Sequence, residues 1–383
     1  MKTIQEKVMD CSIENHTSLK GKKVLLRIDV NTSLGENGVV DPGEDWRIIK
    51  SYQTIDYLVD KGACVVVISH IGREKEESLK PVYEYMRQHV DIGFLPNYDA
   101  ELLQNSIENM QHGSVIMLEN LRQFSEEKDN DSSFLGTVIG LCDLYVNDAF
   151  SVSHRKHASV HDVVTKLPAY FGLQFVDEVT ELSKTSDTNT NTVLILGGAK
   201  FGTKLDLLAQ FLPKVSYALV GGALANVFLR ERGFEIGNSF ADDVDISDIV
   251  NSEKIILPID IVDQHGDVAS IDGVGKEDII LDIGPETEKL FETIIDQSDT
   301  ILWNGPMGKY EDGYVAGSVA VADSIARSGA FSVTGGGDTA TVILEEELED
   351  NFDFISTGGG AMLDFLVQGT LPGIDIIVNK NNE

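Results

Sequence analysis

Short apolar runs alternate with amphipathic segments along nearly the whole chain. Each run ends in Gly, Asn, Asp or His, and a helical pattern follows it. Continuous apolar strands between helices are typical of parallel sheets covered on both faces. The runs span residues 24–30, 64–69, 115–118 and 144–146 in the first half, and 193–196, 218–220, 255–257, 300–303, 331–334 and 354–356 in the second. This pattern predicts an α/β protein with two doubly wound, Rossmann-like parallel-sheet domains.

A hinge helix is predicted between the two halves. Apolar residues recur at helical spacing over 173–184, and the polar stretch SKTSDTNTNT follows. The 383 residues suffice for two or three domains. We expect an N-terminal domain over 1–171, a helix and linker over 172–186, a C-terminal domain over 187–365 and a tail over 366–383. The hydropathy pattern alone does not place that tail.

The chain is strongly acidic. It has 63 Asp and Glu against 30 Lys and Arg, which gives a formal net charge of -33. A general nucleic-acid-binding protein would need a basic surface, which this composition does not provide. Because charges more than ~8 Å apart are largely screened in physiological salt, an anionic ligand would depend on cations gathered at its own site.

The sequence also favours a cytoplasmic protein that does not contact membranes. No apolar stretch approaches the roughly 18 residues of a membrane span, and the N-terminal segment lacks the apolar core of a secretory signal. Cys11, Cys64 and Cys142 are far apart and form no disulfide or metal-binding pattern, as expected in a reducing compartment.

Four strands in the second half run directly into glycines and then into a helix. They read VLILGGAKFGTKL, ALVGGALANVF, SVTGGGDTATVI and FISTGGGAMLDFL. Glycine lets a ligand approach the backbone closely, and helix N-termini attract anions. Any one of these turns could be a plain packing turn, but four together predict a nucleotide or phosphate site. It is not a P-loop, because Thr203-Lys204 reverses the required order, and no GxGxxG fingerprint follows a strand.

Polar side chains near these glycines fit the same chemistry. Lys200 and Lys204 lie on one face at a helix start, where they oppose the helix dipole unless an anion binds there. Asp338 fits either a helix cap or a ligand of Mg²⁺ beside phosphates. Thr339 could bind a phosphate, and Glu311 could accept ribose hydroxyls or be a solvated acid.

Strands in the first half end in charged and amide side chains instead. Four of the nine arginines lie at or near these ends, and arginine binds carboxylates and phosphates bidentately. The alternative is that they form salt bridges with the many acids. Taken together they predict a site for a small, multiply charged anion. The candidates are Asp29, Asn31, Arg47, His70, Arg73, Arg122, His154, Arg155 and His157. The two histidines 154 and 157 lack the flanking ligands of a metal site.

A nucleotide site in one half and an anion site in the other suggest phosphoryl transfer. That reaction depends mainly on positioning and charge stabilisation rather than on a protein nucleophile. We expect the two sites to face a cleft between the domains, with domain closure joining them and excluding water.

Eleven colinear segments resemble the phosphoglycerate kinase family over nearly the whole chain. They are LLRIDVN, SHIGR, LENLR, YVNDAF, SHRKHAS, LGGAK, LPIDIV, DIGP, WNGPMG, GGGDT and STGGGA. The resemblance implies reversible phosphoryl transfer between 1,3-bisphosphoglycerate and MgADP, giving 3-phosphoglycerate and MgATP. It also implies a monomer that bends at a hinge, and a C-terminal tail that returns to the N-terminal domain.

The resemblance assigns roles to individual residues. It places the phosphoglycerate on the nine candidates of the first half and the Mg²⁺ of the nucleotide on Asp338. Catalytic roles would fall to Arg47, Lys200, Lys204 and Gly359. Nucleotide binding would fall to Gly197, Gly198, Lys200, Lys204, Gly221, Gly222, Asn304, Glu311, Gly336, Gly337, Asp338 and Thr339.

Several positions depart from the family pattern. Thr32-Ser33 replaces a usual Val-Pro, and Glu74 replaces a Pro. GGAKFGTK stands where the family has a GGAKVSDK-like run, and GKYE stands where it has GVFE. The stretch over residues 237–282 is shorter than is typical of the family. These changes bear on nucleotide affinity.

Two other classes of protein remain possible from the residues alone. One is a silent relative that binds ligands without turnover. The other is a nicotinamide dehydrogenase, which the missing GxGxxG disfavours.

Overall fold

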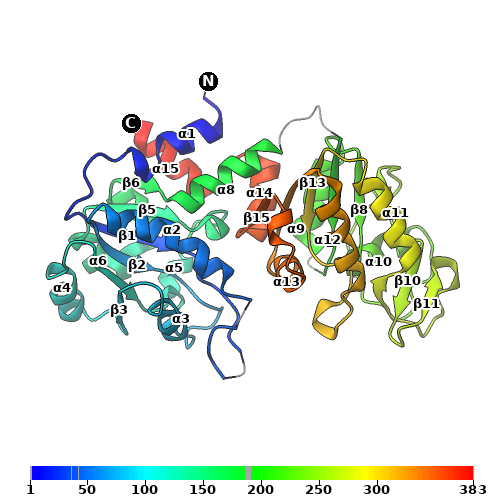
Figure 1. Cartoon of the computed structure of the whole chain (residues 1–383), viewed down its shortest axis with the longest axis horizontal. Coiled ribbons are helices and arrows are strands. Elements are labelled where there is room, and N and C mark those ends of the chain that lie inside the picture. Colours follow the sequence, from blue (N-terminus) through cyan, green and yellow to red (C-terminus); the bar gives the residue numbers. More distant parts are fainter. Residues whose placement is uncertain (1, 36, 42, 186–190, 200, 383) are drawn as a thin grey trace. The chain divides into compact units, whose positions relative to one another are not determined.

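The computed structural model describes residues 2–199 and 201–382, apart from 36, 42 and 186–190. The chain forms two compact units. Unit 1 comprises Met1–Ser183 together with Gln368–Glu383, and unit 2 comprises Lys184–Val367. Each unit is built on a six-stranded sheet with helices packed against it (Figure 1).

The sheet of unit 1 has the order β3-β4-β2-β1-β5-β6, and every neighbouring pair is parallel. Its strands are β1 (Lys23–Ile28), β2 (Cys64–Ile68), β3 (Ile92–Leu95), β4 (Val115–Leu118), β5 (Leu144–Asp148) and β6 (Ala169–Phe171). The helices are α1 (Ile4–Asp10), α2 (Trp46–Asp60), α3 (Lys80–Met86), α4 (Ala100–Glu108), α5 (Ser125–Lys128), α6 (Gly136–Leu141), α7 (Asp162–Lys166), α8 (Leu173–Lys184) and α15 (Pro372–Asn382).

Unit 2 has a parallel sheet of the order β15-β14-β13-β7-β8-β9. Its strands are β7 (Thr192–Leu196), β8 (Tyr217–Val220), β9 (Ile255–Ile256), β13 (Thr300–Asn304), β14 (Phe331–Gly335) and β15 (Phe354–Ser356). The helices are α9 (Phe201–Phe211), α10 (Gly222–Glu231), α11 (Pro285–Ile295), α12 (Ala316–Ser328), α13 (Gly337–Glu345) and α14 (Gly359–Gln368).

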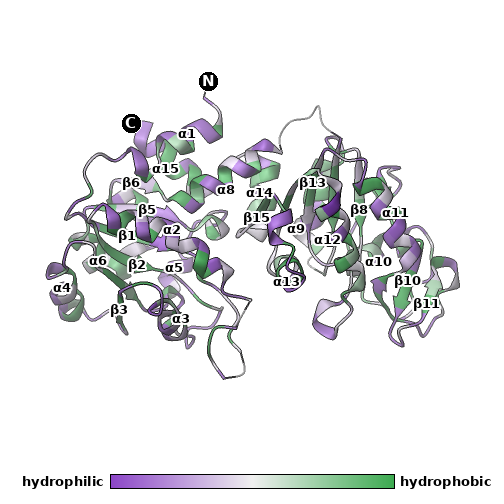
Figure 2. Ribbon diagram, viewed as in Figure 1, coloured by the Kyte–Doolittle hydropathy of each residue, from purple (hydrophilic) through white to green (hydrophobic). Residues whose placement is uncertain are grey.

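Burial explains why the central strands are apolar throughout. Every residue of β2, β5, β7 and β13 is buried. Figure 2 shows hydrophobic residues along the strands, whereas the helices combine hydrophobic and hydrophilic faces. Strands buried on both faces read as continuous apolar runs rather than as alternating ones. The two parallel sheets confirm the predicted fold class.

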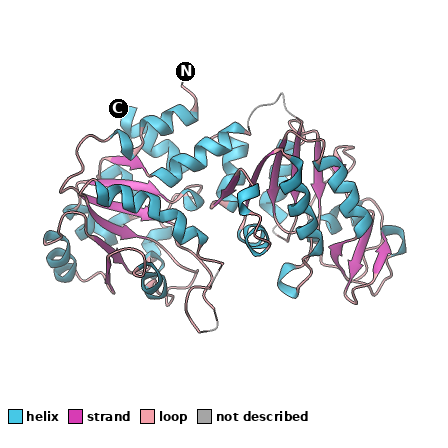
Figure 3. Ribbon diagram, viewed as in Figure 1, coloured by secondary structure: helices cyan, strands magenta, loops and turns pink. Residues whose placement is uncertain are grey.

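Unit 2 also contains a small antiparallel sheet that the sequence analysis did not predict. It has the order β11-β10-β12, with β10 (Asp260–Asp263), β11 (Val268–Ser270) and β12 (Ile280–Ile283) (Figure 3). Strands of three or four residues give too short a pattern to recognise from hydropathy. The same reason accounts for the missed edge strands β3 and β6.

The last helix of the chain belongs to unit 1. The Lys380 ammonium group donates hydrogen bonds to the carbonyl oxygens of Val164 and, at 2.8 Å, of Leu167. Asn381 Nδ2 donates to the carbonyl oxygen of Ala169 at 2.9 Å. These carbonyls end α7 and begin β6, so the contacts fasten α15 to the edge of the sheet. Such long-range contacts have no local sequence pattern.

Among the described residues, no single helix is both long and apolar enough to cross a membrane. The helices α14 and α15 reach the length and apolar composition of a membrane span only when they are taken as a pair, and this pair is bent by 59°.

A buried carboxylate fixes the start of α11. Asp260 accepts hydrogen bonds from the backbone N–H groups of Glu286, at 2.9 Å, and Thr287, at 2.8 Å. We expect Asp260→Ala to lower the free energy of unfolding by about 2 kcal/mol, because these donors lose their acceptor. Urea denaturation measures the change. The exposed Asp296, at the other end of α11, is the matched control, and equal small effects of both alanine variants would contradict the capping role.

Candidate functional site

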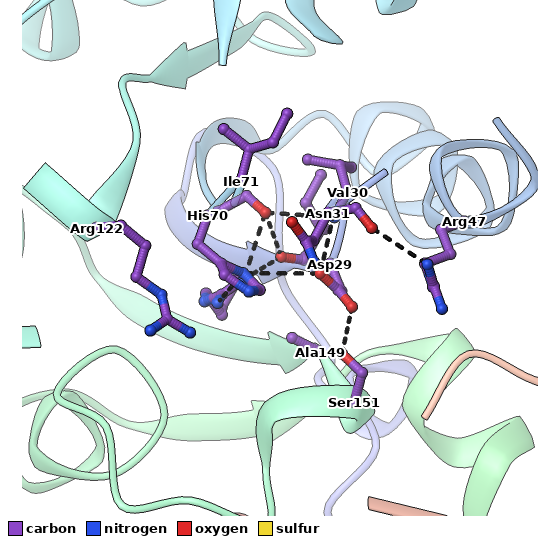
Figure 4. Close-up of polar contacts among 12 residues, drawn as sticks. Asp29, Val30, Asn31, Arg47, His70, Ile71, Arg122, Ala149 and Ser151 are labelled. Carbon is purple, nitrogen blue, oxygen red and sulfur yellow. Dashed lines mark hydrogen bonds and ion pairs between the residues drawn. The ribbon is translucent and has the colours of Figure 1, made fainter. Parts of the chain in front are cut away.

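The carboxyl end of β1 carries the centre of the site in unit 1. Asp29 follows the last residue of the strand, and its Oδ1 lies 3.7 Å from His70 Nδ1 at the end of β2. The backbone N–H of Asn31 donates to Asp29 Oδ1 at 3.2 Å, and the Ser151 hydroxyl donates to Oδ2. Burial would raise the pKa of Asp29, but His70, Arg47 and Arg27 outweigh it and lower the pKa. Asp29 therefore carries a buried negative charge among cations (Figure 4).

Arg47 extends toward this centre from the first turn of α2. Its Nη1 donates to the Asn31 carbonyl oxygen at 3.3 Å, and the guanidinium lies 4.7 Å from the ring centroid of Trp46. Asn31 Oδ1 in turn accepts from Gly72 N at 2.8 Å. The Nε of Arg47 is buried and has no hydrogen-bond partner among the described residues. A buried donor without an acceptor is costly, so an anion at this position would stabilise it.

The loop after β2 is held by the residues that follow β4. Asn120 Oδ1 accepts from Ile71 N at 3.2 Å, and its Nδ2 donates to Ile71 O at 2.9 Å and to Glu77 O at 2.8 Å. Because β2 and β4 are parallel neighbours, their carboxyl ends meet, and the LENLR segment fixes the SHIGR segment. The neighbouring Asn120 and Glu119 are therefore supports of the loop, since Glu119 accepts from Leu79 N at 2.7 Å.

Arg122 and His157 extend the positive region. Burial, and then the charge of Arg27, lowers the pKa of Arg122, whose buried Nε has no hydrogen-bond partner in the part of the chain that the structure describes. Burial, followed by the charges of Arg122 and Arg155, lowers the pKa of His157 to about 3. Glu127 Oε1 lies 3.9 Å from His157 Nδ1, and Glu127 and Asp29 oppose the lowering of the Arg122 pKa. An anionic ligand would add further negative charge beside Arg122.

Three of the predicted residues lie at the margin. Arg73 and Arg155 are exposed, and His154 is half-buried. Arg155 Nε donates to His154 Nε2 at 2.9 Å. Arg73 is bonded through its backbone, which donates to Glu77 Oε2 at 2.6 Å. The structure thus brings Asp29, Asn31, Arg47 and His70 into direct contact, whereas Arg73 is joined to this group only through the loop.

The sequence analysis missed two charged residues beneath the site. Arg27, the last but one residue of β1, and Glu127, on α5, are each only 1% exposed. The signal for Arg27 was present in LLRIDVN, because an arginine inside an apolar strand must find polar partners when the strand is buried. Glu127 gave no such signal, because it lies in a polar segment.

In unit 2 the glycine-rich ends of β7, β8 and β13 are bonded to one another. Gly197 N donates to Asn304 O at 3.1 Å, and Gly222 N donates to Met307 O at 2.8 Å. A Cβ at Gly197 would lie 2.0 Å from the Pro306 carbonyl oxygen, and one at Gly222 would lie 2.6 Å from Gly198 N. These positions need glycine because the backbones approach closely, and Gly222 also has a φ of 57°.

Lys204 is buried beside these turns and is 6% exposed. Its ammonium group donates to the Gly197 carbonyl oxygen, which places a positive charge at the carboxyl end of β7. Lys200, the other predicted lysine, lies outside the described residues. Gly221 is the N-cap of α10, and the N–H groups of Gly221 and Leu224 donate to the carbonyl oxygens of Leu196 and Gly198, so this helix start is bonded to the end of β7.

The ends of β14 and β15 also adjoin. A Cβ at Gly359 would lie 3.0 Å from Gly336 Cα, so the starts of α13 and α14 are close together. Asn304 Nδ2 donates to Gly335 O at 2.6 Å, and Thr339 Oγ1 accepts from Gly305 N at 2.8 Å. Two helix N-termini side by side form a strong anion-binding position.

The predicted acids of unit 2 are exposed. Asp338 lies in the first turn of α13, directly after Gly337. Glu311 lies in a short turn, Tyr310–Asp312, and no hydrogen bond joins it to the glycine-rich ends among the described residues. No group of three or more His, Cys, Asp or Glu side chains in the described ranges is placed to hold a metal ion.

Comparisons with known proteins agree on one family. A family model described as phosphoglycerate kinase matches residues 14–369. The chain is 39% identical over 386 residues to phosphoglycerate kinase of Dictyoglomus turgidum, covering 94% of this chain and 97% of that protein. It is 38% identical over 397 residues to that of Koribacter versatilis, covering 94% and 98%.

Solved structures give the same result. Phosphoglycerate kinase from Coxiella burnetii matches with a TM-score of 0.79 and 31% identity, over 97% of this chain and 99% of that chain. The enzyme from Pyrococcus horikoshii matches with a TM-score of 0.85 and 26% identity, over 97% and 100%. The chain therefore belongs to the phosphoglycerate kinase family, and it is a phosphotransferase whose small-molecule substrates are 3-phosphoglycerate and ADP or ATP.

Proposed function

We propose that unit 1 binds the phosphoglycerate at the carboxyl ends of β1, β2, β4 and β5, and that unit 2 binds the nucleotide at its glycine-rich strand ends. The chemical difference between the two sets of residues supports this assignment of the two ligands. Among the described residues, unit 1 gathers two arginines, Arg47 and Arg122, whose buried Nε atoms have no hydrogen-bond partner, whereas unit 2 brings the starts of α13 and α14 close together. Guanidinium groups suit the carboxylate and phosphate of a small acid, and helix N-termini suit a polyphosphate.

On the phosphoglycerate side, Asp29 and Asn31 orient the ligand while the cations bind its charge. Asp29 also places a buried negative charge beside Arg47. Arg122, His157, His154, Arg155 and Arg73 would complete the positive surface. Arg47 lies over Trp46, and its Nε has no hydrogen-bond partner in the described part of the chain, so it would bind the phosphoryl group during transfer. Its contribution would be charge stabilisation of the transition state.

On the nucleotide side, Gly197, Gly198, Gly221, Gly222 and Asn304 would form the slot. Lys204 would bind a phosphate, with Lys200 as its partner. The adjoining starts of α13 and α14 would present the N–H groups of Gly337 and Gly359 to the phosphoryl oxygens. Thr339 would hold a phosphate, and Glu311 the ribose. The reaction then moves the phosphoryl group from the acyl phosphate oxygen to the terminal phosphate oxygen of ADP.

Asp338 fits a Mg²⁺ ion that arrives with the nucleotide. Its carboxylate is exposed at the start of α13, next to the glycines that would face the phosphates. Mg²⁺ usually takes one or two carboxylates together with phosphate oxygens, and it would neutralise phosphate charge.

Phosphoryl transfer requires the two ligands to meet in line, and the residues proposed for each ligand belong to different units. We therefore propose closure by bending at a hinge near α8. We also propose that the enzyme acts as a monomer in the cytoplasm.

Arg47→Ala is expected to reduce kcat by about 100-fold or more, because a charge-stabilising donor in the transition state is lost. A coupled assay of ATP formation from 1,3-bisphosphoglycerate and MgADP measures it, and circular dichroism checks the fold. Arg87→Ala is the control, because Arg87 is exposed and its guanidinium contacts Glu84 and the ring of Tyr83 within α3. Near-normal turnover of Arg47→Ala would remove this residue from the mechanism.

Lys204→Met keeps the aliphatic stem but removes the charge. We expect the KM for MgADP to rise about tenfold, because a charge-assisted hydrogen bond to phosphate is lost. The KM for 1,3-bisphosphoglycerate should change little. Lys214→Met, at an exposed position beyond α9, controls for loss of one surface charge. A similar rise in the KM values for MgADP and for 1,3-bisphosphoglycerate would argue against a role of Lys204 in nucleotide binding.

Asp338→Asn is expected to raise the Mg²⁺ concentration that gives half-maximal rate several-fold, because a neutral amide is a weaker Mg²⁺ ligand. The rate is measured across a Mg²⁺ series at fixed ADP. Asp350→Asn changes another exposed acid of unit 2 and serves as the control. An unaltered Mg²⁺ profile would rule out Asp338 as a ligand.

A further inference from the structure

A buried chain of hydrogen bonds runs beneath the substrate site from Glu127 to His70. The Glu127 carboxylate accepts from Ser159 twice, with Oε1 at 2.7 Å from the hydroxyl oxygen and Oε2 at 2.9 Å from the backbone nitrogen. Arg27 Nε donates to Ser159 Oγ at 3.0 Å, and Arg27 Nη2 lies 3.1 Å from His70 Nδ1. All four residues are buried.

The donors along this chain have only one consistent arrangement. A guanidinium group can donate hydrogen bonds but cannot accept them. The hydroxyl hydrogen of Ser159 must therefore point to Glu127, and its lone pair must face Arg27. The Tyr145 hydroxyl donates to the Ser159 carbonyl oxygen at 2.6 Å and fixes this segment further.

The same rule determines the tautomer of His70. Because Arg27 Nη2 can only donate, His70 Nδ1 must be the acceptor, and the proton of the neutral ring must lie on Nε2. The competing partner is Asp29 Oδ1, but it lies 3.7 Å from Nδ1, beyond hydrogen-bond distance. The other guanidinium contacts, to Ile28 O and to Ser69 Oγ at 3.4 Å, hold Arg27 in this orientation.

The surroundings also keep the ring neutral. Burial lowers the pKa of His70, and Arg27, Arg122 and His157 lower it further, whereas Asp29 opposes them. These groups come from β1 and from the segments that follow β4 and β5. A neutral ring needs no proton uptake when an anionic ligand binds, and it offers that ligand a directional N–H donor.

We propose that Glu127 and Ser159 are positioning residues which, through Arg27, hold His70 in its neutral Nε2–H tautomer, so that His70 meets the phosphoglycerate as a hydrogen-bond donor. The last clause rests on the proposed placement of the substrate in unit 1. None of Glu127, Ser159 and Arg27 needs to touch the ligand, because each acts through its neighbour in the chain of hydrogen bonds.

The first test uses the unaltered full-length enzyme. Nitrogen-15 NMR of the histidine side chains distinguishes protonated from unprotonated ring nitrogens, and His70→Gln assigns the His70 signals. We expect His70 Nδ1 to be unprotonated and Nε2 to be protonated throughout pH 6 to 8. A proton on Nδ1, or titration of the ring within this range, would overturn the proposal.

The second test removes only the bridging hydroxyl. Ser159→Ala leaves the backbone contact with Glu127 intact, but Arg27 Nε loses its acceptor. We expect a second His70 tautomer to appear and the KM for 3-phosphoglycerate to rise about tenfold, with kcat nearly unchanged. Ser159→Thr should restore both. Ser51→Ala is the matched control, because this hydroxyl in α2 is also buried and donates to Ile48 O within its own helix.

The outcomes separate this proposal from the placement of the substrate. If Ser159→Ala leaves the His70 signals unchanged, the chain of hydrogen bonds does not set the His70 tautomer and the proposal is wrong, whatever the kinetics show. The wild-type tautomer could be as proposed while 3-phosphoglycerate does not shift the His70 signals. In that case the chain of hydrogen bonds is supported, and the proposed substrate site is wrong. If Ser159→Ala does not fold, the wild-type spectrum still decides the tautomer.

Discussion

The parallel direction of the strands is the constraint on which the rest of the structure depends. In each six-stranded sheet all strands point the same way, so their carboxyl ends, and the loops that follow them, meet at one edge. Residues as distant in sequence as Asp29, His70 and Asn120 become neighbours for this reason. The glycine-rich turns after β7, β8, β14 and β15 are likewise brought to one edge of unit 2. The identity of the residue that follows each strand therefore decides the chemistry of the edge.

With the ligand sites proposed above, local charge rather than net charge would govern ligand binding in this acidic protein. The chain carries a formal charge of -33, yet arginines and Lys204 stand at the strand ends. Exposed acids beyond ~8 Å are screened, whereas buried cations keep their full effect. Asp29 is the exception inside the cluster, and its low pKa makes it a fixed negative charge beside Arg47 and Arg27. The remaining positive charge is what a multiply charged substrate would neutralise.

Features that depend on a local pattern could be predicted from the sequence. The buried strands, the helix Leu173–Lys184 and the four glycine-rich ends each occupy one continuous segment, and the structure contains them all. Arg27 carried a signal as an arginine inside an apolar strand, but its link to Glu127 through Ser159 could not be predicted, because it joins segments more than 30 residues apart. The short antiparallel sheet was not predicted, because strands of three or four residues give too short a hydropathy pattern. The return of the C-terminal tail to the N-terminal domain was expected only from the family resemblance, because the contacts of α15 join segments far apart in the sequence. The helix α15 and the short antiparallel sheet are stabilised by tertiary contacts, which the hydropathy pattern of a single segment does not reveal.

A crystal structure of the full-length chain with 3-phosphoglycerate and MgADP would test the central claim most directly. The account predicts substrate oxygens within hydrogen-bond distance of Arg47, His70 and Arg122, and nucleotide phosphates at the starts of α10, α13 and α14. A phosphoglycerate bound away from the strand ends of unit 1, with the Nε atoms of Arg47 and Arg122 still unpaired, would contradict it.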